Sequence, residues 1–562
     1  MTARTPVPAA APSGWTSRQG LELADLVPAE ARASWSDQGH YPDQDLYRLF
    51  RARVARHPGR PAVIDPAGSL NYAELDHRVR GIAAALGRAG IRSREIVAIR
   101  LPNGRHAVAA ELAVAALGSV ALTFPDGRGS AEALSLLARS RATALVAGAA
   151  TTRAVTAGAA RLPSLRAVFT FEEAPPGVRR LLPAHRGGTP PFVPVTAHPG
   201  APARILVSSG SESEPKMIAY SHNAMAGGRG NYLRAVYADT EVPRALVLVP
   251  LASSYGSLGT VTLYRHGGTL VLLDGFDAAS ALRAVTVHRP THLFGVATML
   301  TRMTALAPAP DEDLGSLRSL VLSCDGIPAP VLTACLDRFG CPVSNLYGSS
   351  DGINCRVEHR RPSEDGTLLG RPDPAVCEIR AFDPQGRPLP PEQDGELWAL
   401  GPMTPLGYVG APELDADRRV RGWVRTGDHG RLTADGRVRL LRRNSQLVKR
   451  GGYSISPAEV ERHVAHHPAL AEAVCVATPD RELGERLCLC VVPRAGLPTP
   501  RLADLNRFLE DVRGLERRKL PEQLVVLPEL PLGATGKLSR PELSRLAAAA
   551  VADRPQVPVE AR

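Results

Sequence analysis

Through the first two thirds of the chain, short unbroken runs of apolar residues alternate with segments long enough to be helices. Such runs are typical of strands buried on both faces, and the segments between them would supply the helices that cover those faces. Repeated alternation of this kind favours an α/β fold with layered, largely parallel sheets. The strand candidates are residues 96–101, 205–207, 245–249, 269–273, 292–296 and 317–322, and the helix candidates include 105–117, 278–288, 298–306 and 331–339.

The pattern changes twice toward the C-terminus, which divides the chain into domains. Residues 371–440 hold dense Gly, Pro and Asp turns between short strands, as in a small β-rich subdomain. A compact α+β domain begins near residue 441, and Ser456 followed by Pro457 and Glu459 predicts the start of one of its helices. We expect a flexible N-terminal lead at 1–40, a large N-terminal domain at 41–441, a small C-terminal domain at 442–550 and a disordered tail at 551–562.

Composition argues against several classes of function. The formal net charge is +11, but the basic residues are dispersed and only 4% of residues are aromatic, so we expect no nucleic-acid binding. All eight cysteines follow residue 320 and none forms a Cys-x-x-Cys pair, which favours a reducing compartment over a disulfide scaffold or a zinc site. The sequence shows no secretory signal and no apolar run of about 20 residues, so we expect a cytoplasmic protein without membrane contact.

Lysine is rare, and three of the four lysines lie in loops rich in small residues. The 67 basic residues include only Lys216, Lys449, Lys519 and Lys537 as lysines. Where arginine supplies generic positive charge, a retained lysine indicates a need for a compact ammonium on a flexible stem. Lys216 ends a Ser/Gly loop, residues 208–216, that follows a predicted strand. Backbone N–H groups and hydroxyls of such a loop can bind phosphate oxygens, and the lysine adds a positive charge.

Four further motifs follow this loop in order. They are 345–352 (Asn-Leu-Tyr-Gly-Ser-Ser-Asp-Gly), 424–430 (Val-Arg-Thr-Gly-Asp-His-Gly), 441–445 (Leu-Arg-Arg-Asn-Ser) and 530–537 (Leu-Pro-Leu-Gly-Ala-Thr-Gly-Lys). Together the five motifs resemble the adenylate-forming superfamily, which includes acyl- and aryl-CoA synthetases, nonribosomal adenylation domains and firefly luciferase. The resemblance extends over residues 46–546. It implies a large adenylation domain, a small mobile C-terminal domain, and an enzyme that uses ATP and Mg²⁺ to activate a carboxylic acid as an acyl adenylate.

The resemblance also implies a role for each motif. Adenine would lie against Tyr347 beside Gly348, Ser350 would contact the α-phosphate, and Asp351 would bind Mg²⁺ in place of the family's glutamate. Lys537 would bridge the attacking carboxylate and the α-phosphate, because one ammonium can stabilise the charge that builds on both oxygens. The other expected nucleotide contacts are Ser208, Ser209, Gly210, Ser211 and Lys216 at the β- and γ-phosphates, Ser323, Cys324, Asp325 and Gly326 near adenine, Asp428 at the ribose hydroxyls, and Arg442 and Lys449; Asn444 would be the hinge of the C-terminal domain.

The phosphate loop departs from the family pattern Ser-Gly-Ser/Thr-Thr-Gly-x-Pro-Lys-Gly. Glu212 and Ser213 replace Thr-Gly, Glu214 fills the free position, and Met217 replaces the last glycine. Two carboxylates next to a polyphosphate should repel it unless magnesium or arginine intervenes. These residues leave open an alternative from another class, a degenerate adenylation fold that serves as a binding or regulatory partner.

The expected acid pocket contains no counter-ion for an α-ammonium. Amino-acid-activating members of the family place an aspartate early in this pocket, but the matching segment 250–256 has no acidic residue, so an α-amino acid is disfavoured. Residues 348–354, with Gly-Arg-Pro at 370–372, look most like the aryl-acid branch, which activates hydroxybenzoates and related acids. The expected pocket residues are Ser253, Ser254, Tyr255, Gly256, Asn354 and Cys355, and they are equally consistent with an alicyclic or short acyl acid.

We therefore expect a stand-alone acid–thiol ligase of secondary metabolism, such as antibiotic biosynthesis. It would activate a carboxylic acid, aromatic by resemblance (hydroxybenzoate-like or heteroaromatic), as its acyl adenylate. Transfer to a pantetheine thiol would follow. The acceptor would be coenzyme A, which we favour, or the phosphopantetheine of a separate carrier protein.

Overall fold

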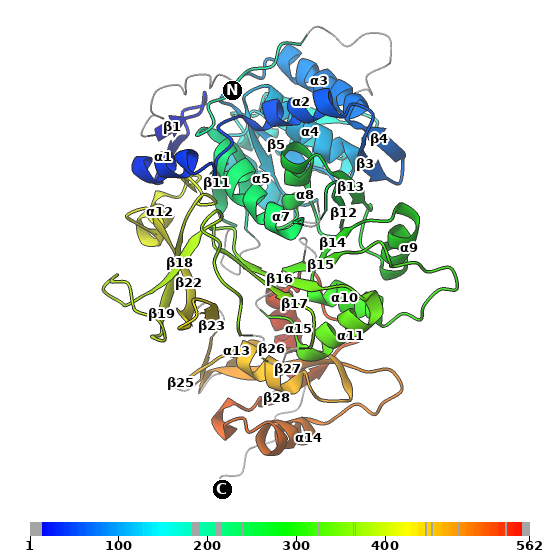
Figure 1. Ribbon diagram of the computed structural model, residues 1–562, viewed down its shortest axis with the longest axis vertical. Coiled ribbons are helices and arrows are strands. Elements are labelled where there is room, and N and C mark those ends of the chain that lie inside the picture. Colours follow the sequence, from blue (N-terminus) through cyan, green and yellow to red (C-terminus); the bar gives the residue numbers. More distant parts are fainter. Residues whose placement is uncertain are drawn as a thin grey trace.

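The computed structural model (Figure 1) describes residues 14–126, 129–181, 192–208, 215–238, 240–323, 326–362, 365, 367–443, 447–450, 453–480, 483–533 and 537–552. Within these ranges, the side chains of residues 159, 442, 443, 453, 454 and 552 are not described. None of the described helices is long and apolar enough to cross a membrane.

Two eight-stranded sheets form the large domain, and most of their strands are parallel, as the alternating pattern predicts. The first sheet has the order β20-β11-β10-β6-β5-β7-β8-β9, and β11 runs antiparallel to both of its neighbours, β10 and β20. The second has the order β17-β16-β15-β14-β12-β13-β3-β4, with antiparallel strands at both ends. Their bounds are β5 (Ile96–Arg100), β6 (Val120–Thr123), β7 (Ala144–Ala147), β8 (Ala167–Thr170), β9 (Arg179–Arg180), β10 (Pro202–Val207), β11 (Met217–Ser221) and β20 (Gly407–Tyr408) in the first sheet, and β3 (Pro61–Asp65), β4 (Gly68–Asn71), β12 (Arg244–Val247), β13 (Thr269–Leu272), β14 (His292–Gly295), β15 (Ser319–Ser323), β16 (Val343–Gly348) and β17 (Asn354–His359) in the second.

Helix α4 (Arg105–Ala116) joins the two sheets into one core. It contacts β5 and β6 of the first sheet and β3 of the second, and it is buried along nearly its whole length. Its alanines suit this position because small side chains let the sheets approach closely. The other helices of the large domain are α2 (Leu46–Arg56), α3 (Tyr72–Arg88), α5 (Ser130–Arg139), α6 (Ala149–Ala157), the π-helical segment η2 (Ala224–Arg229), α7 (Gly230–Val236), α8 (Leu258–Val261), the π-helical segment η3 (Thr262–His266), α9 (Ala278–His288), α10 (Ala297–Thr304) and α11 (Ala329–Phe339).

The β-rich subdomain and the C-terminal domain follow where the sequence pattern places them. The subdomain sheet has the order β18-β19-β22-β21, with β23 paired to β22. In the C-terminal domain, at the bottom of Figure 1, the sheet order is β25-β24-β27-β26, with β28 paired to β27. The bounds are β18 (Glu378–Phe382), β19 (Gly395–Leu400), α12 (Pro412–Arg418), β21 (Arg419–Val420), β22 (Trp423–Leu432), β23 (Val438–Arg443), β24 (Val448–Arg450), β25 (Tyr453–Ile455), α13 (Pro457–Val464), β26 (Leu470–Asp480), β27 (Gly484–Pro493), α14 (Leu502–Arg507), β28 (Gln523–Val526) and α15 (Arg540–Ala552).

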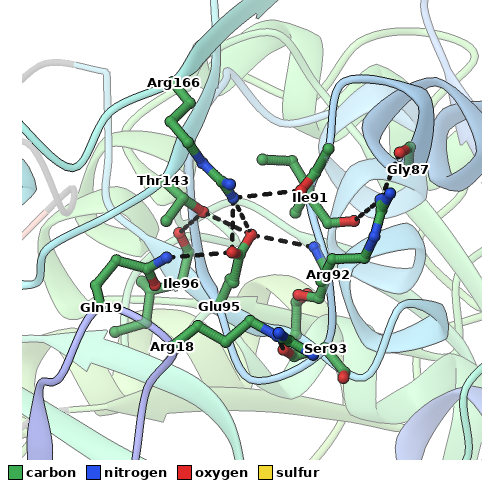
Figure 2. Close-up of polar contacts among 12 residues, drawn as sticks. Arg18, Gln19, Gly87, Ile91, Arg92, Ser93, Glu95, Ile96, Thr143 and Arg166 are labelled. Atoms are coloured by element: carbon green, nitrogen blue, oxygen red, sulfur yellow. Dashed lines mark hydrogen bonds and ion pairs between the residues drawn. The ribbon is translucent and has the colours of Figure 1, made fainter.

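Residues 14–40, expected to be flexible, are instead folded against the large domain. They form β1 (Gly14–Thr16), β2 (Glu22–Ala24) and α1 (Ala29–Asp37). Figure 2 shows the anchor, the buried carboxylate of Glu95, which accepts hydrogen bonds from Gln19 Nε2 at 3.1 Å and from Arg166 Nη2 at 2.5 Å. Beside it, Arg18 Nε donates to the Ser93 carbonyl at 2.8 Å. Burial of a charged carboxylate is costly unless hydrogen-bond partners compensate it, and the N-terminal segment supplies one of these partners, Gln19. The prediction of a flexible lead is wrong for residues 14–40.

The expected domain boundaries shift slightly at the C-terminal side. Strand β23 continues to Arg443, so the subdomain sheet extends two residues past the predicted end of the large domain at 441. Helix α15 runs to Ala552, so the first two residues of the predicted tail are helical. The rest of the tail, and Asn444 at the predicted hinge, lie outside the described residues.

Candidate active site

A cavity of about 1430 Å³ lies where the large domain, the β-rich subdomain and the C-terminal domain meet. Each of the three parts contributes a residue singled out from the sequence: Ser208, Asp428 and Lys537. Sequence motifs more than 300 residues apart therefore line the same cavity. A concave site with convergent polar groups is the arrangement expected for binding a small molecule.

Asp428, on β22, is held at the cavity wall by Tyr347. The Tyr347 hydroxyl donates to Asp428 Oδ2 at 2.5 Å, and both side chains are buried. The Tyr347 ring is fully buried and is not among the residues that line the cavity, so its contact with adenine stays a prediction. On β16, Leu346 and Gly348 line the cavity, and Tyr347 points to the opposite side of the strand. Tyr347 thus orients the carboxylate that we expected at the ribose hydroxyls.

The loop after β16 brings Ser350 and Asp351 to the cavity. The Tyr408 hydroxyl donates to Asp351 Oδ1 at 2.5 Å, and the Ser350 carbonyl accepts from Tyr220 at 2.9 Å. Asp351 Oδ2 has no hydrogen-bond partner among the described residues, which fits the oxygen ligand that Mg²⁺ prefers. Gly352 has φ of +100°, and a Cβ there would lie 2.7 Å from Pro405 Cδ. Only glycine suits this turn.

Tyr408 was not singled out from the sequence, and its removal should weaken magnesium binding. Burial and the Asp351 charge raise the pKa of Tyr408, so its hydroxyl remains a donor at all working pH values. We expect Tyr408→Phe to raise the Mg²⁺ concentration that half-saturates ATP–pyrophosphate exchange by about tenfold, since the bond reaches a charged group. The matched control is Tyr237→Phe, which removes a buried hydrogen bond to Thr262 outside the cavity. An unchanged Mg²⁺ dependence in Tyr408→Phe would show that the hydrogen bond from Tyr408 does not help Asp351 to bind Mg²⁺.

The ends of the phosphate loop are closed by two hydrogen bonds. Ser208 N donates to the Lys216 carbonyl at 2.9 Å, and Lys216 N donates to Ser208 Oγ at 3.0 Å. Arg139 Nη1 donates to the Pro215 carbonyl at 3.1 Å. Ser208 and Lys216 line the cavity. The residues between them lie outside the described residues, including the expected contacts Ser209, Gly210 and Ser211 and the acidic residues Glu212 and Glu214.

Lys537 reaches the large domain from a tight loop of the C-terminal domain. Gly533 N donates to the Lys537 carbonyl at 2.7 Å, and Ser539 N donates to the Pro531 carbonyl at 2.9 Å, which closes the loop just before α15. Lys537 Nζ donates to Ser323 Oγ at 3.2 Å, at the end of β15. Both residues line the cavity. The Lys537 ammonium therefore faces the same cavity as Ser350 and Asp351.

The remaining expected nucleotide contacts differ in where they lie: some line the cavity, one does not, and others have no described side chain. Lys449 is exposed on β24 and is not among the residues that line the cavity, so its nucleotide contact stays a prediction. Gly348 and Gly326 do line the cavity. Arg442 lies opposite His429 on paired strands, but its side chain is not described. Cys324 and Asp325 also lie outside the described residues.

Arg302 ties the large domain to the segment that precedes the Lys537 loop. On α10, its Nη2 lies 3.1 Å from Glu529 Oε2 and donates to the Leu530 carbonyl at 3.4 Å. The Glu529 side chain is 71% exposed, so the ion pair is weak. It nevertheless forms in the arrangement that places Lys537 in the cavity. It should therefore favour that arrangement over a rotated one.

Loss of this contact should affect the two half-reactions differently. We expect Arg302→Ala to lower ATP–pyrophosphate exchange by about two- to fivefold, the value of one exposed ion pair. Thioester formation from supplied acyl adenylate should be unchanged or faster. Arg289→Ala, which removes an exposed pair with Asp313 within the large domain, is the control and should change neither rate. An equal loss in both half-reactions would exclude a role in domain arrangement.

On the acid side, the structure brings three of the six predicted residues to the cavity: Ser254, Tyr255 and Asn354. Ser253, Gly256 and Cys355 do not line it. Ser253 Oγ donates to the Pro250 carbonyl at 2.7 Å and accepts from Gly256 N, so both residues shape the turn. A Cβ on Gly256 would lie 2.0 Å from the Pro250 oxygen, which explains the glycine. Cys355 is buried on β17 and its Sγ donates to the Leu369 carbonyl.

Arg229 also lines the cavity and was not predicted. It ends η2, is 3% exposed, and lines the cavity beside Ser254. Burial lowers its pKa from the ordinary arginine value. The signal for it was present in the sequence, since a single arginine stands among small residues in Ala-Met-Ala-Gly-Gly-Arg-Gly at 224–230.

Two family models match the chain, the AMP-binding enzyme at residues 50–409 and the AMP-binding enzyme C-terminal domain at 459–537. The chain belongs to the AMP-binding enzyme family. Among curated proteins it is 31% identical to a salicyl-AMP ligase / salicyl-S-ArCP synthetase of Mycobacterium tuberculosis, over 92% of this chain and 93% of that protein. It is 28% identical to a 2-hydroxy-7-methoxy-5-methyl-1-naphthoate–CoA ligase of Streptomyces carzinostaticus, over 92% and 95%.

The fold of this AMP-binding enzyme is also found among solved structures. The amide bond synthetase McbA from Marinactinospora thermotolerans superimposes with a TM-score of 0.76 at 28% identity, over 89% of this chain and 99% of that one. The large domain and the small C-terminal domain expected from the motifs are therefore both present. Family and site together make the protein an acid-adenylating, AMP-forming ligase.

Proposed function

We propose that this AMP-binding enzyme activates an aromatic carboxylic acid with ATP and transfers the acyl group to a pantetheine thiol, that of coenzyme A in preference to a carrier protein. The observation that carries the proposal is the convergence of Lys537, Asp351 and the acid-side residues on one cavity. Relatives named for salicylate and for a substituted naphthoate support an aromatic acid. One of these names includes a carrier-protein product and the other coenzyme A, so the two acceptors are compared directly in the experiment.

The geometry accounts for the first half-reaction. The carboxylate of the acid attacks the α-phosphorus of ATP, an acyl–phosphate bond forms, and pyrophosphate leaves. Lys537 would stabilise the charge shared by the attacking and α-phosphate oxygens, and Asp428 would accept hydrogen bonds from the ribose hydroxyls. Asp351 would hold Mg²⁺, which neutralises the phosphate charge when bound. Lys216, at the end of the phosphate loop, would pair with the leaving phosphates.

The acid side of the cavity combines apolar walls with a few hydrogen-bonding groups. Leu258, Val296 and Ile353 supply the walls, while Ser254 and Asn354 supply polar groups. This mixture suits a planar ring with polar substituents. Because segment 250–256 contains no carboxylate, an α-ammonium would have no counter-ion there.

ATP–pyrophosphate exchange over a panel of hydroxybenzoic, heteroaromatic, alicyclic and α-amino acids tests the reaction. We expect exchange with aromatic acids and none with α-amino acids. Coenzyme A and a phosphopantetheinylated carrier protein, offered separately to the charged enzyme, distinguish the acceptors. Silence over the whole panel, with ATP still bound, would support the degenerate-partner alternative instead. Exchange confined to α-amino acids would overturn the aromatic assignment.

A further inference from the structure

Arg229 is a buried cation for which the protein provides no anion. It lies at the end of η2, where its neighbours are small because other chain segments approach closely. A Cβ on Gly228 would lie 2.3 Å from Met403 N, and one on Gly230 would lie 2.7 Å from Arg265 Cγ. The segment is thus tightly packed around the arginine. The side chain has little room to leave its position.

Every described partner of the guanidinium is neutral. Nη1 donates to the Ser254 carbonyl at 3.0 Å and to Ser257 Oγ at 3.1 Å, and Nη2 donates to Ser254 Oγ at 3.0 Å. The ring of Tyr220 faces the guanidinium, with Cζ 5.1 Å from the ring centroid. Nε has no hydrogen-bond partner among the described residues. Nη2 carries two N–H donors and donates to only one acceptor among the described residues, which leaves a donor for an anionic ligand.

The nearest comparison within the fold is Arg204, which is equally buried. Arg204 Nη1 lies 2.5 Å from Glu111 Oε1, so its charge is paired. Arg229 has no ion pair with any described carboxylate, and Arg204 is itself one of the charges that acts on it, unfavourably. A buried unpaired charge is costly for a folded protein. Uncompensated charge that lines a substrate cavity indicates a ligand that brings the compensating charge.

Contacts around Tyr220 place Arg229 relative to the reacting centre. The Tyr220 hydroxyl donates to the Ser350 carbonyl at 2.9 Å, and the same ring lies against the guanidinium. Arg229 and the Ser350–Asp351 loop therefore contact the same side chain, Tyr220. An acid whose reacting carboxylate lies near Ser350 would present the far side of its ring to Arg229 and Ser254.

We propose that the activated acid carries a second anionic group, best matched by a second carboxylate on the same ring, and that Arg229 binds it. The inference rests on the proposed function and narrows its substrate class from aromatic acids to aromatic dicarboxylic acids. Only the carboxylate near Ser350 is adenylated. The second one stays ionised and neutralises Arg229. Ser254 orients the guanidinium through both its carbonyl and its hydroxyl.

The test compares acids that differ only in the second group. ATP–pyrophosphate exchange is measured with the three benzenedicarboxylic acids, their monoamides, salicylic acid and benzoic acid, on the wild type and Arg229→Met. We expect one dicarboxylate isomer to exceed its monoamide and benzoic acid at least 100-fold in kcat/KM. In Arg229→Met that preference should fall below threefold. Arg229→Lys should retain part of the preference.

Three outcomes would overturn the inference without touching the proposed function. They are exchange with no preference for a second anion, a preference for salicylic acid over every dicarboxylate, and a preference unchanged in Arg229→Met. Binding is measured independently, as the rise in Tm on adding each dicarboxylate or its monoamide. If no acid of the panel exchanges, the proposed function is set aside, and this measurement still decides the role of Arg229. A rise for a dicarboxylate that is lost in Arg229→Met supports it, and equal rises in both proteins contradict it.

Stability separates a binding role from a structural one. If Arg229 serves the ligand, its replacement by methionine removes an uncompensated charge and should leave the Tm of the unliganded protein unchanged or higher. If it serves the fold, Arg229→Met should lower the Tm, as we expect of Arg204→Met. Ser254→Ala removes one guanidinium partner and keeps the charge. It should reduce the preference for the dicarboxylate only partly.

Discussion

Lys537→Ala should abolish adenylation and spare thioester formation. We expect ATP–pyrophosphate exchange to fall by about 10²–10³-fold, the loss typical of a donor aimed at developing transition-state charge. The reason is geometric, since Lys537 Nζ lies in the cavity within 3.2 Å of Ser323 Oγ and its loop is closed by backbone hydrogen bonds. The second half-reaction, measured with chemically prepared acyl adenylate and coenzyme A, should proceed at nearly the wild-type rate.

The control for this experiment is Lys519→Ala. Lys519 lies in the same C-terminal domain, and its Nζ pairs with Glu459 at 2.8 Å outside the cavity. This variant removes an equal charge and should leave both half-reactions unchanged. Equal losses in the two half-reactions of Lys537→Ala would assign the lysine a structural role. Retained exchange would remove it from the catalytic residues altogether.

Glu111→Gln should destabilise the protein more than any surface substitution. Glu111, on α4, pairs with Arg204 at 2.5 Å, and the Arg204 side chain is only 1% exposed. Breaking a buried ion pair from one side leaves the other charge uncompensated, at about 3–5 kcal/mol. Arg204 Nη2 also donates to the Leu251 carbonyl at 2.7 Å, in the segment that carries Ser254. We therefore expect a lower Tm and denaturant midpoint together with a raised KM for the acid.

Two variants frame this result. Asp313→Asn removes the carboxylate of an exposed pair with Arg289 and should leave the denaturant midpoint nearly unchanged. The double variant Glu111→Leu with Arg204→Met replaces both charges by apolar groups and should recover much of the lost stability. A double variant no more stable than Glu111→Gln would mean that packing, and not the unpaired charge, sets the cost.

Elements with a strong local pattern were predicted well. Helix α9 spans Ala278–His288, the predicted range, and α13 begins at Pro457 after Ser456. Apolar strands in parallel sheets carry a continuous signal because both of their faces are buried. Even here a local rule can fail in detail, since the Ser456 side chain makes no capping hydrogen bond. The motif loops were located because their residue types are tied to phosphate and carboxylate chemistry.

The features that sequence reasoning missed depend on contacts between distant segments. Motif matching did not predict that the Tyr347 hydroxyl donates to Asp428, because this contact joins β16 to β22. The Tyr408 hydroxyl reaches Asp351 because the short strand β20 pairs with β11 at the edge of the first sheet. Residues 14–40 lack a strong apolar pattern, and their order comes from Glu95 and its neighbours in the large domain. No pattern within any of these three segments carries this information.

The scarcity of lysine limits the damage that the enzyme's own intermediate can do. Acyl adenylates that escape from an active site acylate amines, whereas the permanently protonated guanidinium of arginine is a poor nucleophile. Of the four lysine amines of the chain, Lys216 and Lys537 line the cavity, and only Lys449 and Lys519 lie outside it. Self-acylation of lysine side chains is thereby confined to four positions. A surface built from arginine makes the protein a poor target for its own reactive product.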